Sequence, residues 1–188
     1  MPSAILGSSY LECLPDTNIL CQTFRMKNLT ATICLSVALL FGTSGLSWSQ
    51  DFQKGFTAYQ SGDYATALRE WTPLAEQGDA GTQFNLGVMY RQGKGVPQDY
   101  KTAVKWYTLA AEQGNTNAQY NLGAMYAFGQ GVLKDYVYAH MWGNLAASNG
   151  NELGAKLRDF VEKKMTPADI STAQKLAREC VRKKYKGC

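Results

Sequence analysis

A stretch of 36 residues occurs twice in this chain. Residues 79–114 align with residues 115–150 without a gap and are identical at 17 of 36 positions. The second half of the same unit occurs once more, 36 residues earlier, in residues 63–78. A fixed period of this length is typical of a solenoid, in which each unit packs against its neighbours. It is not typical of a domain with a single core.

Each unit shows the spacing of two helices. Phe84, Leu86 and Tyr90 recur at steps of two to four and predict a first helix with one apolar stripe. Ala103 and Trp106 belong to the same kind of stripe in a second helix. The repeated unit is therefore a helical hairpin.

The ends of the second helix are marked by residues that suit helix termini. Asp99 and Asp135 stand where this helix begins, and a carboxylate there accepts a backbone N–H that has no partner within the helix. Gly78, Gly114 and Gly150 stand where it ends, because glycine readily adopts the left-handed conformation just past a helix. The carboxylates thus have a structural role, and we do not interpret them as an acid–base pair.

Two glycines fall inside the predicted first helices. Gly87 and Gly123 each cost about 1 kcal/mol of helix propensity relative to alanine. Such a cost indicates that the partner helix approaches closely at these points. Ala103 and Ala139 are small residues on that partner helix and fit this prediction.

The loop of the hairpin, GKGVPQDY at residues 93–100 and GQGVLKDY at residues 129–136, is rich in glycine. A phosphate-binding glycine loop follows a strand and often ends in a Lys-Ser/Thr pair. These loops follow a helix and lack that pair. We therefore expect them to turn the chain between antiparallel helices, with Val96 and Val132 filling the apolar gap beneath.

LGVMYRQGKGVPQDYKTAVKWYTLAAEQG and LGAMYAFGQGVLKDYVYAHMWGNLAASNG resemble the Sel-1-like repeat family, which is related to tetratricopeptide repeats. The resemblance covers residues 50–150, in units of about 52–78, 79–114 and 115–150. The first unit lacks the Gly-x-Gly-Val insertion and is more similar to an ordinary tetratricopeptide hairpin. The resemblance implies an all-α, right-handed α/α solenoid of antiparallel hairpins.

The C-terminal segment, residues 151–188, departs from the repeat. Residues 151–164 continue as a helix, and Thr166, Pro167 and Asp169 mark the start of a last one. We expect these helices to close the open end of the solenoid and to carry a basic tail. Two apolar faces are predicted on them: Leu153, Leu157, Phe160 and Val161 on the first, and Ile170, Ala173, Leu176, Ala177 and Cys180 on the second.

The first 49 residues are not expected to belong to the fold. Residues 26–49 read as a secretory signal, with a positive start and an apolar run too short to span a bilayer. Residues 1–25 show no helical or strand periodicity, and we interpret them as a spurious or unstructured extension. The mature chain is then residues 50–188, and its location is the periplasm or the outside of the cell.

The cysteines divide along the same boundary. Cys13, Cys21 and Cys34 fall in the segment that we expect to be lost. Cys180 and Cys188 remain, an even count in an exported protein, and predict a disulfide. Two reduced thiols are the alternative.

The charge is concentrated at the C-terminus. The formal net charge is +4 at pH 7, too small to indicate nucleic acid by itself. The tail ARECVRKKYKGC could meet an acidic partner or an anionic lipid surface, with a solvated helix end as the simpler interpretation. Export makes nucleic acid a poor candidate, and we expect none as a partner.

The sequence offers little material for catalysis. His140 is the only histidine and stands where the preceding unit has Val104, so we expect a surface or half-buried position. One histidine and two tail cysteines do not assemble a zinc site or a Cys–His nucleophile. The sequence therefore predicts no catalytic residue, no metal, no cofactor and no enzymatic activity.

The resemblance implies a protein-binding scaffold or adaptor whose concave groove is lined by the first helices. Six groove positions are nominated by similarity to tetratricopeptide grooves: Phe84, Val88, Arg91, Tyr120, Ala124 and Ala127. Six others are assigned to the core: Leu86, Tyr90, Trp106, Leu122, Tyr126 and Trp142.

Two alternatives stay open at this point. One is a protein that binds or hydrolyses β-lactams or cell-wall fragments, as is described for some secreted cysteine-rich relatives. Those relatives carry a cysteine pair in each repeat, which this chain lacks. The other is an adaptor that docks by its basic tail. The partner's identity and the oligomeric state are left open, and a monomer is compatible with the sequence.

Overall fold

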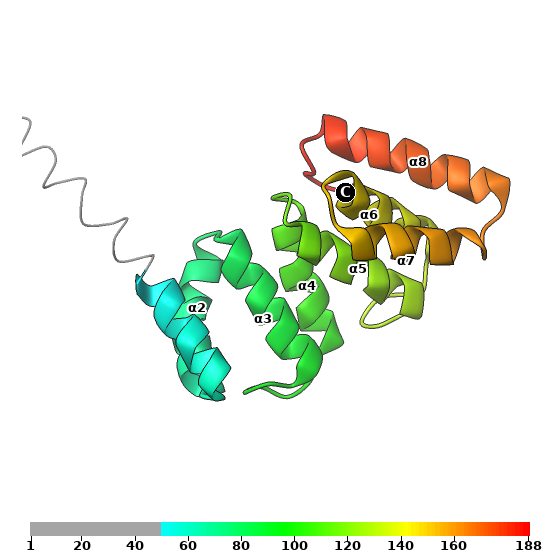
Figure 1. Cartoon of the computed structure of the whole chain (residues 1–188). Coiled ribbons are helices and arrows are strands. Elements are labelled where there is room, and N and C mark those ends of the chain that lie inside the picture. The colour runs from blue at the N-terminus through cyan, green and yellow to red at the C-terminus, as the bar shows by residue number, and fades with distance from the viewer. Residues whose placement is uncertain (1–49) are drawn as a thin grey trace, which may run out of the picture. The chain divides into compact units, whose positions relative to one another are not determined.

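The computed structural model of the chain describes residues 50–188, which belong to the unit Trp48–Cys188. The predicted extension over residues 1–25 and the predicted signal peptide over residues 26–49 lie outside the described residues. The described part is built of helices and turns and contains no strand, which confirms the predicted all-α class (Figure 1). None of its helices is both long enough and apolar enough to cross a membrane.

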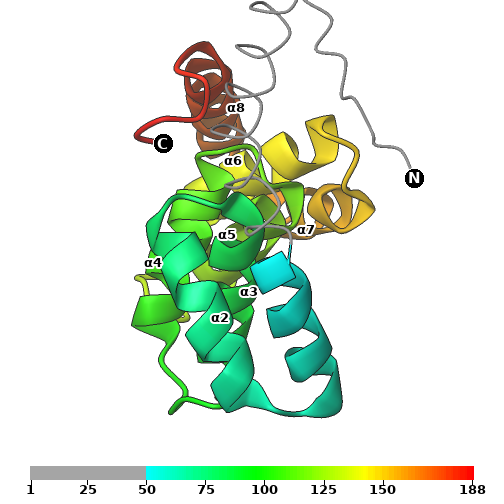
Figure 2. The ribbon, with the colours of Figure 1, turned by 90° about the vertical axis from the view of Figure 1, so that its left-hand side faces the viewer.

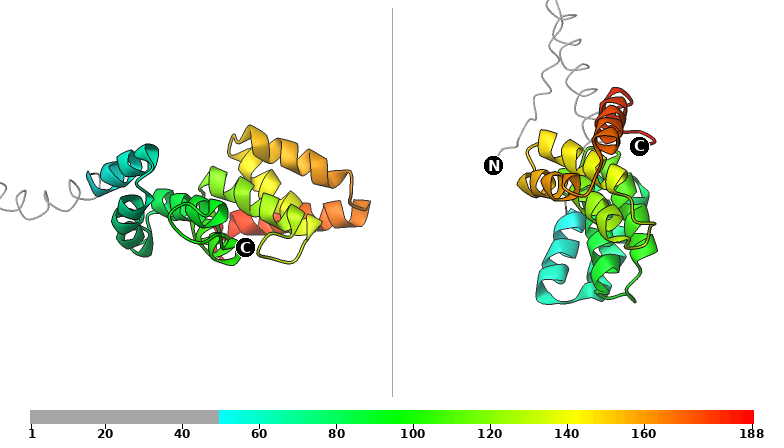
Figure 3. Two further views of the ribbon diagram at one scale, coloured as in Figure 1. Left: turned by 90° about the horizontal axis from the view of Figure 1, so that it is seen from below. Right: turned by 90° about the vertical axis from the view of Figure 1, so that its right-hand side faces the viewer.

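The helices follow one another as antiparallel hairpins in chain order (Figures 1 and 3). The first described helix covers residues 50–61 and pairs with the next across a short turn at Gly62 and Asp63. The others are α2 (Tyr64–Glu76), α3 (Ala80–Gln92), α4 (Tyr100–Ala111), α5 (Thr116–Phe128), α6 (Tyr136–Ser148), α7 (Glu152–Glu162) and α8 (Pro167–Arg182).

The predicted helix ends are confirmed. Asp99 and Asp135 are the N-caps of α4 and α6, and each carboxylate accepts hydrogen bonds from two backbone N–H groups of the first turn. Gly78, Gly114 and Gly150 follow the second helices with φ of 100°, 85° and 87°. These positive φ angles reverse the chain toward the next hairpin at no steric cost for glycine.

The glycines inside the first helices lie where the partner helix comes close, as predicted. A Cβ on Gly87 of α3 would lie 2.6 Å from the ring of Tyr107 on α4. A Cβ on Gly123 of α5 would lie 3.2 Å from both the carbonyl oxygen of Ala139 and the Cβ of Trp142 on α6. The approach to α3 is thus made by an aromatic ring and not by the small Ala103, the partner that the sequence predicted.

The residues assigned to the core pack as expected. Leu86, Leu122 and Trp142 are buried. Tyr90, Trp106 and Tyr126 are partly buried and pack against the core clusters.

A buried glutamine joins the first repeat junction. Gln83 of α3 is 3% exposed, and its Nε2 donates to the carbonyl oxygen of Ala75 in the last turn of α2, at 2.9 Å. Its Oε1 accepts from Nε2 of Gln113, which follows α4, at 2.8 Å. One side chain therefore links the ends of two successive second helices.

The same linkage recurs one period later. Gln119 of α5 is fully buried, and its Nε2 donates to the carbonyl oxygen of Ala111 at 3.2 Å. Its Oε1 accepts from Nδ2 of Asn149, which follows α6, at 3.3 Å. We call these contacts the amide ladder.

The last helix leaves the pattern of hairpins. α8 packs along α6 and not against α7, its neighbour in the chain (Figures 1 and 2). On α7, Leu157 and Val161 are buried, whereas Leu153 and Phe160 are 51% and 43% exposed. The prediction of a single buried face for α7 is therefore wrong for these two residues, because α8 is not placed to cover them.

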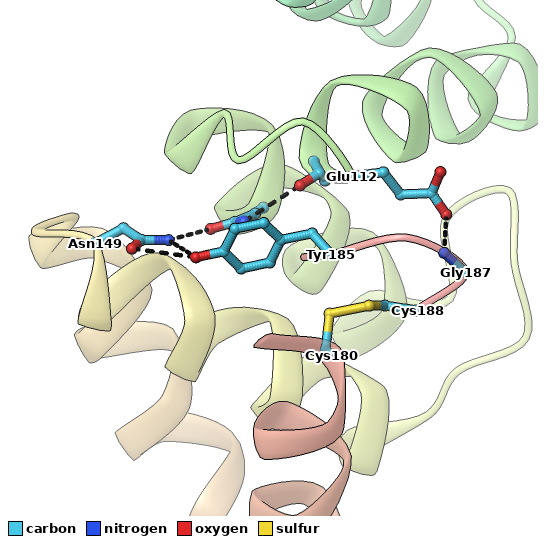
Figure 4. Close-up of a disulfide and its surroundings, with 8 residues drawn as sticks. Glu112, Asn149, Cys180, Tyr185, Gly187 and Cys188 are labelled. Carbon is cyan, nitrogen blue, oxygen red and sulfur yellow. Dashed lines mark hydrogen bonds between the residues drawn. A yellow bond between two sulfur atoms is a disulfide. The ribbon is translucent and has the colours of Figure 1, made fainter. Parts of the chain in front are cut away.

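A disulfide between Cys180 and Cys188 folds the C-terminus back onto the repeats. Within the loop that it closes, the Tyr185 hydroxyl accepts from Nδ2 of Asn149 at 3.2 Å (Figure 4). The N–H of Gly187 donates to Oε1 of Glu112, beyond α4, at 2.9 Å. A loop this short stabilises the fold by about 2–3 kcal/mol in the chain-entropy account. We call residues 180–188 the C-terminal strap.

His140 corrects another expectation. The sequence predicted a surface or half-buried position, but the residue is 1% exposed, and neither ring nitrogen has a hydrogen-bond partner. The nearest carboxylate oxygen, Oε2 of Glu162 on α7, lies 3.5 Å from Nε2. The counterpart Val104 is only partly buried. α6 differs from α4 because both α7 and α8 pack on it.

Removing one glutamine of the amide ladder should destabilise the fold. Gln119→Ala removes a fully buried side chain together with its hydrogen bonds to the carbonyl of Ala111 and the amide of Asn149, and should lower the free energy of unfolding by about 1–3 kcal/mol. Gln60→Ala, at an exposed helical position, is the control and should change it by less than about 0.5 kcal/mol. Denaturant unfolding measures both; equal effects would contradict a structural role for the ladder.

Acid should destabilise the protein partly through His140. Burial lowers the pKa of its imidazole, and the neighbouring Glu162 opposes only part of this effect. The unfolded chain therefore takes up a proton first, so this contribution to stability is present above about pH 6.5 and is lost as the pH falls below it. Unfolding free energies at pH 7.5 and 5 should differ more for the wild type than for His140→Gln. Identical differences would show that His140 is not responsible.

Candidate protein-interaction face

The first helices of successive hairpins carry apolar side chains at matching positions. Phe52, Val88, Ala124 and Phe160 are each 36 residues apart and occupy the same place in successive units. Residues four positions before or after them lie on the same side of each helix. We define the first-helix face by these and their neighbours: Phe52, Phe56, Phe84, Val88, Tyr120, Ala124, Phe128, Leu153 and Phe160.

The most exposed part of this face lies on α5 and α7. Phe128 is 61% exposed and Phe160 is 43% exposed. Their ring centroids are 6.2 Å apart, so the two rings form a pair that bridges neighbouring first helices. The Nζ atom of Lys164 lies 5.2 Å from the centroid of the Phe160 ring. This pair is an apolar projection with a cation at its border.

The groove positions nominated on α3 and α5 are partly anchored in the core. Phe84 and Val88 pack against the core cluster formed by α4, α5, α6 and α8, and the Phe84 ring lies 5.9 Å from that of Tyr107. Tyr120 and Ala124 pack against the cluster formed by α5, α6 and α7. All four remain partly exposed, so they can offer a surface to a partner.

Two of the nominated residues point elsewhere. Ala127 is 3% exposed and belongs to the core cluster under α7. Arg91, at the equivalent position of α3, is half-buried, and its Nε is buried without a hydrogen-bond partner. Its guanidinium lies near Tyr107, whose pKa is raised to about 12 because burial disfavours the phenolate, although Arg91 opposes the shift. This position of the repeat therefore packs between helices.

Five residues of the first-helix face were not nominated from the sequence: Phe52, Phe56, Phe128, Leu153 and Phe160. The period held a usable signal, because Phe160 falls in register with Val88 and Ala124, which were nominated. The period was not extended to α7, because residues 151–164 were interpreted as part of a segment that closes the solenoid.

The first-helix face is suited to docking because its exposed side chains are mainly apolar. Among residues 50–188 there is no group of three or more His, Cys, Asp or Glu side chains that could hold a metal ion. Aromatic side chains held on regular helices and exposed to water are typical of surfaces that bind other proteins.

Comparison with known proteins agrees with the architecture. The Sel1 repeat model matches residues 80–115 and 116–151. No curated protein sequence matches the chain. Among solved structures, the chain is similar to c5321, a protective antigen of uropathogenic Escherichia coli strains with an SLR fold, at 31% identity and a TM-score of 0.69. That match covers 73% of this chain and 31% of c5321.

A Sel1 repeat protein from Oxalobacter formigenes is similar at 30% identity and a TM-score of 0.56. The match covers 58% of this chain and 45% of that protein. The chain therefore spans less than half the length of either solved protein.

Substituting Ala127 and Phe128 of α5 one at a time should distinguish a core position from an exposed position of the first-helix face. Ala127→Asp places a carboxylate in the core and should lower the free energy of unfolding by about 3 kcal/mol or more. Phe128→Asp places it on the exposed face and should change that free energy by less than about 1 kcal/mol. Both positions lie in the last turn of α5, so the effect of the helix dipole is similar. Denaturant unfolding measures both, and similar losses would contradict the assignment.

Proposed function

This chain belongs to the Sel1-like repeat family, and we propose that it is an exported adaptor that binds another protein through its first-helix face. Repeats of this family generally serve as protein-interaction scaffolds. The proposal adds the surface, the chemistry of the partner and the location.

The observation that carries the proposal is the exposed pair of Phe128 and Phe160. Burying one phenylalanine side chain is worth about 1.5–3 kcal/mol relative to leaving it in water. The two rings come from different helices, α5 and α7, that pack against each other. Because the helices already fix their positions, little conformational freedom is lost when a partner covers them.

The border of the face indicates the charge of the partner. Lys156 and Lys164 stand one period after Tyr120 and Phe128, so the face changes from aromatic to basic at its C-terminal end. A partner segment with apolar side chains followed by carboxylates would match both parts. Rim charges of this kind chiefly affect the association rate and its dependence on salt.

Two features support export to the periplasm or beyond. Residues 26–49 have the pattern of a secretory signal. The disulfide between Cys180 and Cys188 is of a kind that persists in oxidising compartments and is rare in the cytosol.

Chemical crosslinking and affinity capture from cells that make the full chain test the proposal. The wild type should retain a partner, and Phe128→Asp/Phe160→Asp should lose it. In the complex the two substitutions replace apolar contacts that the partner buries with unpaired charges. Leu109→Asp is the matched control: Leu109 is 45% exposed but lies on α4, a second helix. It should retain the partner.

Circular dichroism of each variant shows whether the fold is kept, and N-terminal sequencing of the captured chain shows whether it was processed at the predicted boundary. Retention of the partner by the double variant would contradict the first-helix face. Loss only after charge removal at residues 183–186 would favour the basic tail. A captured chain that begins upstream of Gln50 would contradict signal removal as predicted.

A further inference from the structure

A cleft opens where α8 leaves α7. The two helices diverge after the turn that joins them, α8 lying along α6 (Figures 1 and 3). The space between them has a volume of about 340 Å³. It is lined by polar side chains from three helices: His140 and Asn144 of α6, Arg158 and Glu162 of α7, and Gln174 and Arg178 of α8. None of these residues belongs to the first-helix face.

The polar groups of the cleft are poorly satisfied by the protein. His140 is 1% exposed, and neither ring nitrogen has a hydrogen-bond partner within the described chain. A buried polar group without a hydrogen-bond partner destabilises the fold. In native structures such a group usually has a bound water or ion as its partner, or a functional role. Asn144 is partly buried and Gln174 and Arg178 are exposed, and within residues 50–188 their side chains make no hydrogen bond or ion pair with the protein. The cleft therefore offers the side chains of Asn144, Gln174 and Arg178 to a ligand.

The charges of the cleft are of both signs. Arg158 is occupied by Asp159, whose Oδ1 accepts from Nε at 2.9 Å and from Nη2 at 2.7 Å. Arg178 on the opposite wall has no such partner and is the available cation. Glu162 is the only acidic residue of the lining, and it faces His140.

We propose that this cleft binds a small zwitterion, a free amino acid or a dipeptide, with its carboxylate on Arg178 and its amino group on Glu162. A guanidinium binds a carboxylate through parallel hydrogen bonds, and a carboxylate binds an ammonium as an acceptor. An anion without an amino group is repelled by the carboxylate of Glu162. A cation without a carboxylate is repelled by Arg178 and Arg158. The volume lies at the small end of the range for ligand sites.

The histidine provides a direct probe. His140 is the only histidine of the chain, so the ring C–H signals of the untagged protein belong to one residue in the cleft. Titration of the full chain with alanylalanine, followed by NMR, should shift these signals saturably. N-acetyl-alanylalanine, which keeps the carboxylate, and alanylalanine amide, which keeps the amino group, should each bind at least tenfold more weakly.

Variants assign the two ends of the ligand. Arg178→Gln should weaken binding of alanylalanine at least tenfold, as should Glu162→Gln. Arg182→Gln is the matched control, because Arg182 is one turn further along α8, is exposed and does not line the cleft. It should leave binding unchanged. Unchanged circular dichroism establishes that each variant is folded.

Three results would overturn the proposal. The first is the absence of a saturable shift of the His140 signals at millimolar alanylalanine. The second is equal binding of the dipeptide and its blocked forms. The third is equal affinity of the Arg178→Gln and Arg182→Gln variants.

Discussion

A buried side-chain amide links the hairpins at two successive repeat junctions, in addition to the apolar core. Gln83 and Gln119 each donate to a carbonyl in the last turn of one second helix and accept a hydrogen bond from a residue that follows the next second helix. Apolar packing alone tolerates sliding, because it is not directional. A buried amide that must donate and accept at fixed points allows one register only. The first helices keep their spacing for this reason, and with it the positions of the side chains that they expose.

The C-terminal end departs from this rule, and both candidate sites arise from the departure. A further repeat would cover α7 with another first helix and its hairpin partner. Instead α8 lies on α6, which leaves Leu153 and Phe160 exposed on one side of α7 and opens a polar cleft on another. The surfaces of α7 that no described helix covers are therefore where both candidate sites lie.

Much of the fold could be predicted because it is local. Asp99 and Asp135 as helix caps and Gly87 and Gly123 as points of close approach follow from backbone chemistry that acts within a few residues. The sites were harder, because they depend on which helix packs on which. Helical periodicity places Leu157 and Phe160 on one apolar face, but only Leu157 packs against α5 and α6, whereas Phe160 remains exposed. His140 was misjudged for the same reason, since its burial comes from α7 and α8 and not from its own helix.

The C-terminal strap stabilises the hairpins near it more than those further away. In a one-dimensional chain of units, each is stabilised by its neighbours, and the ends are the first to open. Here the disulfide closes the loop of residues 180–188, and Tyr185 and Gly187 are hydrogen-bonded to residues that follow α6 and α4 (Figure 4). We therefore expect hydrogen exchange to be slower in the hairpins next to this strap than in those further from it. Phe128 and Phe160 lie in the hairpins next to the strap. A partner that binds them therefore meets a rigid surface and loses little conformational entropy on binding.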